Sequence, residues 1–79
     1  MNAEISILKT RVLGLYTEQR AYLASKPTPF LADLQHEADH VMREAGNFSE
    51  VAAAKINHAA CTVILQERTA TLTNNKNKK

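Results

Sequence analysis

The chain has 79 residues, one cysteine, 44% hydrophobic residues and a formal net charge of +2. A chain this short forms one domain that buries only about 60% of the surface its unfolded form exposes, so we expect a partner subunit or a metal to add stability. One cysteine excludes an internal disulfide and, without a signal peptide, predicts a cytoplasmic location. No apolar run reaches the roughly 18–20 residues that span a bilayer, which excludes a membrane-spanning protein.

The basic residues are concentrated at the C-terminus, where Lys76, Lys78 and Lys79 occur among the last four residues. Without these three lysines the chain has seven basic and eight acidic residues, a net charge of −1. Binding to a phosphate backbone requires a basic face on the folded domain. Nucleic-acid binding is therefore not expected of the body, and a small nucleic-acid-associated regulator stays an alternative only through the tail.

Residues 2–25 show the spacing of a single helix of roughly 23 residues, about 34 Å long. Its apolar residues are Ile5, Leu8, Val12, Leu15 and Tyr22. Asn2 is suited to cap the start of this helix. Gln19 occupies a position of the stripe where an apolar residue is expected. We interpret Gln19 as lying at the edge of a packed stripe, and the alternative is a polar pair that fixes the register between helices.

Pro27 and Pro29 predict a tight turn and then a second helix over residues 29–45. Its apolar residues alternate three and four apart: Leu31, Leu34, Ala38, Val41 and Ala45. The short connection predicts that the first two helices form an antiparallel hairpin.

A third helix is predicted over residues 47–72, started by an Asn47–Glu50 capping box. It has two apolar stripes on opposite sides. One contains Ala52, Ile56, Ala59 and Val63, flanked by Ala53, Ala60 and Ile64. The other contains Val51, Ala54, His58, Cys61, Leu65 and Leu72. We predict that the first stripe packs on the hairpin and that the second is buried against another chain. We also predict one helical domain over residues 1–72, followed by a disordered basic tail over residues 73–79.

His36, Glu37 and His40 match the letters H-E-x-x-H, in which two histidines share a zinc ion and the glutamate activates its water. Zinc peptidases need a third ligand, a cleft and a much longer chain. The helical spacing places both histidines away from the apolar stripe. We interpret them as exposed polar residues, with incidental binding of a surface zinc ion as the alternative, and expect no resident metal or cofactor.

The residues from His40 to Phe48 also resemble the signature of histidine phosphotransfer domains, in which an exposed histidine is followed by an apolar and then a basic residue. The resemblance implies that His40 is the phosphorylated residue and Arg43 its basic neighbour. It covers some nine residues, and Glu44 stands where that family has a glycine. The family's four-helix bundle of about 100 residues would require dimerisation here.

His58 and Cys61, three apart on one face, suit a metal site or an activated thiol, but we interpret both as packing residues. The sequence thus predicts an all-α protein of three helices, completed by oligomerisation into a bundle. We expect a non-enzymatic interaction module, such as a regulator, an inhibitor, an adaptor, or an assembly or secretion chaperone. Its partner interface would contain Val51, Ala54, His58, Cys61, Leu65 and Leu72.

Overall fold

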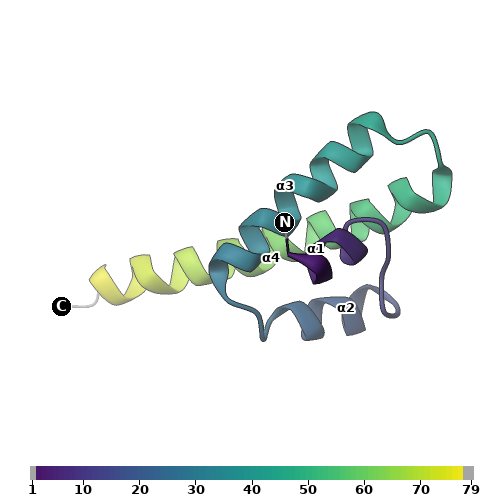
Figure 1. Ribbon diagram of the computed structural model, residues 1–79. Coiled ribbons are helices and arrows are strands. Elements are labelled where there is room, and N and C mark those ends of the chain that lie inside the picture. The colour runs from purple at the N-terminus through teal and green to yellow at the C-terminus, as the bar shows by residue number, and fades with distance from the viewer. Residues whose placement is uncertain (1, 78–79) are drawn as a thin grey trace.

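The computed structural model describes the backbone of residues 2–77 and the side chains of residues 2–71. Its four helices are α1 (Ala3–Leu8), α2 (Tyr16–Leu23), α3 (Thr28–Glu44) and α4 (Phe48–Asn77), shown in Figure 1. No strand occurs within residues 2–77. The all-α class is confirmed. The predicted count of three helices is wrong, because the segment predicted as the first helix forms two separate helices, α1 and α2.

The predicted single helix over residues 2–25 is interrupted between Leu8 and Tyr16. α1 starts as predicted, since Asn2 Oδ1 accepts a hydrogen bond from the Glu4 amide at 2.8 Å. It ends in a tighter turn, in which the Arg11 amide donates to the Leu8 carbonyl at 3.3 Å. The helix therefore stops after fewer than two turns.

The break between α1 and α2 brings both short helices onto one core. A continuous helix would hold Ile5 and Leu23 about 27 Å apart along its axis. In the folded chain both side chains belong to the same buried cluster. Gly14, which is less favourable than alanine in a helix by about 1 kcal/mol, weakens helix formation in the connection. The apolar periodicity of residues 2–25 favours one continuous helix, but burying Ile5 and Leu23 in the same core requires the chain to turn between them.

α3 and α4 form the main antiparallel pair and make the most extensive contact between helices. The predicted stripe of α3 is buried at Leu31, Leu34, Ala38 and Val41. Asn47 Oδ1 accepts from the Glu50 amide at 3.2 Å, which confirms half of the capping box. The principal hairpin is therefore α3–α4, rather than the predicted hairpin of the first two segments.

The buried line of α4 runs between the two predicted stripes. Its members are Ala53, Ala54, Asn57, Ala60, Cys61 and Ile64. Ala54 packs with Ala38 and Val41 of α3, and Cys61 belongs to the main core. These two residues of the predicted partner interface are completely buried within the chain, so their assignment to a free surface is corrected. Contact with α3 and with α2 covers α4 from two directions.

The other members of that predicted interface are less buried. Val51, His58 and Leu65 are half-buried, and the side chain of Leu72 lies outside the described residues. Leu65 packs against the edge of the main core. The continuous free stripe that the sequence predicts is therefore interrupted at its centre.

α4 is much longer than the helices that cover it. Its 30 residues span about 45 Å, against about 26 Å for the 17 residues of α3, and its C-terminal part extends beyond the other helices in Figure 1. α4 continues past the predicted end near residue 72. Of the predicted disordered tail, residues 73–77 have helical backbone here, and residues 78–79 lie outside the described part. Within residues 2–77 no helix is both long and apolar enough to cross a membrane.

Cys61 gives the fold a testable pH dependence. Burial raises the pKa of the Cys61 thiol from 9.0 to about 11, because an apolar environment disfavours the thiolate. A folded-state pKa above the unfolded value means that the associated stability is complete below about pH 9 and is lost as the pH rises towards about 11. We expect urea unfolding to show this loss in the wild type.

The Cys61→Ala variant is the control, because it lacks the thiol and keeps every other ionisable group. We expect its free energy of unfolding to fall less between about pH 8 and about pH 10.5 than that of the wild type. The same pH dependence in both proteins would contradict a buried, protonated thiol.

Candidate functional site

Asn57 is a completely buried amide in the N-terminal third of α4. Its Nδ2 group donates to the carbonyls of Leu8, of Arg11 at 2.8 Å and of Ala53 at 3.1 Å. The first two carbonyls lie where α1 ends, and a helix end leaves such groups without intrahelical partners. Asn57 therefore holds the end of α1 and the following loop against α4.

Gln19 of α2 completes this network. Its Nε2 group donates to Asn57 Oδ1 at 2.6 Å, and its Oε1 atom accepts from the Leu13 amide at 2.9 Å. Gln19 is also completely buried. Our interpretation of Gln19 as an edge residue is wrong, and the polar pair of the alternative is observed between Gln19 of α2 and Asn57 of α4. Among the described side chains, no buried nitrogen or oxygen atom lacks a hydrogen-bond partner.

The loop held by this network exposes apolar side chains. Leu13 and Leu15 are 63% and 76% exposed, and Ile7 on α1 is 56% exposed. Leu15 directly precedes α2, so these leucines lead into that helix. A loop that is fixed by buried hydrogen bonds and still exposes two leucines has the character of a contact surface.

An open groove of about 800 Å³ lies between α2 and the C-terminal half of α4. One face of each helix forms a wall of the groove. On each wall the lining residues lie three, four and seven positions after the first one, which is the spacing of a single helix face. The α2 wall consists of Thr17, Arg20, Ala21 and Ala24. The α4 wall consists of Ile64, Glu67, Arg68 and Thr71. Thr28, the first residue of α3, also lines the groove. The volume is within the range of about 300–1,000 Å³ that is typical of binding pockets.

Short side chains explain why the groove is open. Ala21 on α2 and Ala24, the residue that caps its end, remain exposed, whereas Ile64 on α4 is almost completely buried. Alanines on a wall leave space where leucines would fill the interface. The groove therefore has an apolar floor, although the sequence shows only a weak apolar signal at these positions.

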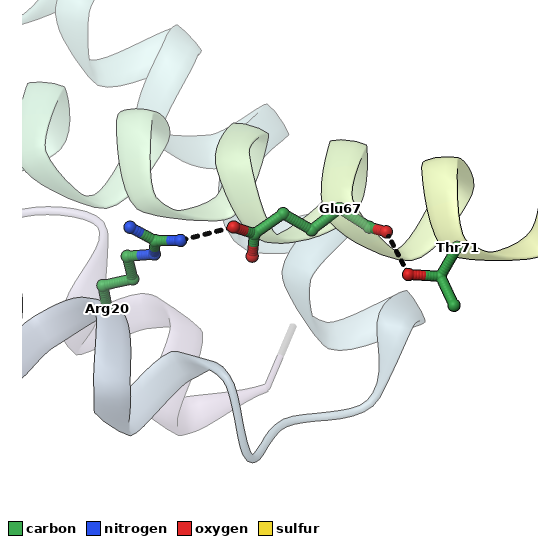
Figure 2. Close-up of polar contacts among 3 residues, drawn as sticks. All are labelled: Arg20, Glu67 and Thr71. Carbon is green, nitrogen blue, oxygen red and sulfur yellow. Dashed lines mark hydrogen bonds and ion pairs between the residues drawn. The ribbon is translucent and has the colours of Figure 1, made fainter. Parts of the chain in front are cut away.

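Two arginines cross the groove at its rim. Arg20 Nη2 lies 2.5 Å from Glu67 Oε2, and Figure 2 shows this pair joining α2 to α4. The Thr71 hydroxyl donates to the Glu67 carbonyl at 2.9 Å, so Thr71 turns its hydroxyl back to its own helix (Figure 2). Both partners of the ion pair are substantially exposed, which keeps its contribution to stability small.

Arg68 fixes the turn between α2 and α3. Its guanidinium donates to the carbonyls of Ala24 at 3.1 Å and Lys26 at 2.8 Å, and to Thr28 Oγ1 at 2.9 Å. The first carbonyl belongs to the capping residue at the end of α2. Arg68 therefore sets the position of α2 relative to α4, and with it the width of the groove.

The structure separates the histidines that the sequence singled out. His36 and His40 are exposed on α3, whereas His58 is half-buried on α4. No group of three or more histidine, cysteine, aspartate or glutamate residues in the described part could hold a metal ion. Arg43, the basic neighbour in the phosphotransfer resemblance, pairs with Asp39 at 3.0 Å. Phosphorylation of His40 stays an untested prediction.

Comparison with known proteins finds no matching family model, and neither the curated proteins nor the solved structures give a significant match. A functional proposal therefore rests on the geometry of this chain.

Arg68 and Arg20 offer a matched pair for testing how the groove is held. We expect Arg68→Ala to lower the free energy of unfolding by about 1–2 kcal/mol, because three hydrogen bonds to the α2–α3 turn are lost. Arg20→Ala removes one exposed ion pair and should cost less than about 1 kcal/mol. Urea unfolding measures both, and equal losses would contradict the role given to Arg68.

A double-mutant cycle tests the buried amide network. Asn57→Leu leaves the Arg11 carbonyl and the Gln19 Nε2 group without partners and removes one of the two donors to the Leu8 carbonyl, so we expect a loss of about 3 kcal/mol. Gln19→Leu should cost about 2 kcal/mol. The double variant should lose less than the sum of the two, by about 1 kcal/mol, because both single changes remove the same bond. Strict additivity in urea unfolding would show that the two side chains do not interact.

Proposed function

We propose that this protein is an interaction module that binds an amphipathic helix of another protein in the groove between α2 and α4. The observation that carries the proposal is the groove itself, whose two helical walls repeat the same spacing. A partner helix that binds in this groove would contact both walls with the residues of one apolar face. The surface proposed for binding thus replaces the α4 stripe that the sequence favoured.

The lining of the groove suggests the chemistry of the partner helix. Its floor of Ala21, Ala24 and Ile64 suits medium-sized apolar side chains. The rim carries two arginines and one glutamate, a net charge of +1. A partner helix with an acidic residue beside its apolar stripe complements this rim. Leu13 and Leu15, just before α2, are also exposed but do not line the groove.

The single cysteine is free and buried, which suits the reducing environment of the cytoplasm, where we propose that the protein acts.

A second copy of this chain is the competing occupant of the groove. Sedimentation equilibrium at micromolar concentration separates the two cases before any partner is tested.

Filling the groove should abolish partner binding without unfolding the chain. Ala24→Phe places an aromatic ring at an exposed position of the α2 wall, so we expect the fold to be retained and the Kd for the partner helix to rise at least about tenfold. The partner is first identified by co-purification from native cells, and its binding helix is then titrated as a peptide by calorimetry.

Ala59→Phe is the matched control, because Ala59 is exposed on α4 but does not line the groove. We expect its Kd to stay within about twofold of the wild type. Circular dichroism should show the same helix content in all three proteins. Equal affinity of the Ala24→Phe and Ala59→Phe variants would place the binding surface elsewhere.

A further inference from the structure

The outer face of α3 carries two histidines one helical turn apart. His36 and His40 are both exposed, on the side of α3 opposite its buried residues. Side chains four apart on a helix have Cβ atoms about 5–6 Å from each other and project in the same direction. Two imidazoles with this spacing can bind one metal ion together.

The polar neighbours of the two histidines are engaged elsewhere. Glu37 lies 3.7 Å from Lys9, Asp39 pairs with Arg43, and Gln35 donates to Thr62 at 2.7 Å. The core of α3 depends on its leucines, Ala38 and Val41, not on the histidines. The packing of the fold therefore does not explain why histidines occupy these two positions.

The charges around the two histidines are net acidic, although Arg43, three residues after His40, lies among them and pairs with Asp39. Asp33 lies three residues before His36, and Glu44 lies four residues after His40, so the helical spacing puts each carboxylate on the same face as one histidine. Both carboxylates are exposed. α3 contains four acidic residues and one arginine, a net charge of −3. Histidines that bind metal commonly donate their second ring nitrogen to a carboxylate, which orients the ring.

We propose that His36 and His40 together bind one divalent transition-metal ion of the class that prefers imidazole, namely Ni²⁺, Cu²⁺ or Zn²⁺, with water in the remaining positions. Within the described residues no third protein ligand joins the pair. Because the Glu37 carboxylate faces Lys9, the site differs from that of a zinc peptidase, where this glutamate activates a water molecule. The site binds an ion on the surface of α3, away from the groove between α2 and α4.

Calorimetric titration of the full chain with Ni²⁺ tests this site. We expect one ion per chain, and we expect His36→Gln and His40→Gln each to weaken binding at least about tenfold. Glutamine keeps a favourable helix propensity, so neither change at these exposed positions should alter helix content. His58→Gln is the matched control, because His58 is a lone histidine on α4, and its affinity should equal that of the wild type.

Thermal unfolding gives a second measurement. Ni²⁺ should raise the Tm of the wild type and of His58→Gln, because the unfolded chain does not keep the two rings one turn apart. It should leave the Tm of the His36→Gln, His40→Gln double variant unchanged. Retention of tight binding by this double variant, or its loss in His58→Gln, would overturn the proposal.

Discussion

The fold depends on one buried amide. Asn57 binds the end of α1, the loop that follows and Gln19 of α2, so a single side chain on α4 holds three segments of the N-terminal part. A buried amide is costly unless its hydrogen bonds are complete, and here its partners satisfy it. Because other arrangements of α1 and α2 would leave these groups unpaired, the network selects one arrangement.

The same arrangement produces the groove. Asn57 and Gln19 hold the start of α2, and Arg68 holds its end through the carbonyls of the following turn. α2 is thereby fixed beside α4 at both ends, while its short side chains leave the space between them unfilled. Burial of Leu23 in the core and the Arg20–Glu67 ion pair also hold α2 beside α4, so the opening reflects the short side chains that line it. A partner helix would bind a preformed surface and pay little ordering entropy.

The candidate groove could not be located from the sequence, for a physical reason. Ala21 and Ala24 add little to an apolar pattern, and the groove exists only because α2 turns back alongside α4. Ala53, Ala60 and Ile64, which flank the stripe predicted to be internal, are buried, whereas the assignment of Ala54 and Cys61 to a free surface is wrong. Residues near the boundary between the stripes, such as Ala54 and Cys61, face the core when neighbours approach a helix from two directions. Periodicity shows that a face is apolar and does not show which neighbour covers it.

By itself, the sequence determined the helical class, the position and buried face of α3, and the start of α4, because these follow from local periodicity, prolines and caps. It also marked Gln19 as a polar residue in an apolar stripe. Only the tertiary structure decided that residues 2–25 form two helices, and that Asn57 is their anchor. The distinction arises because Asn57 is 46 residues from Arg11 and 38 from Gln19 along the chain. A local pattern carries no record of hydrogen bonds formed across such separations.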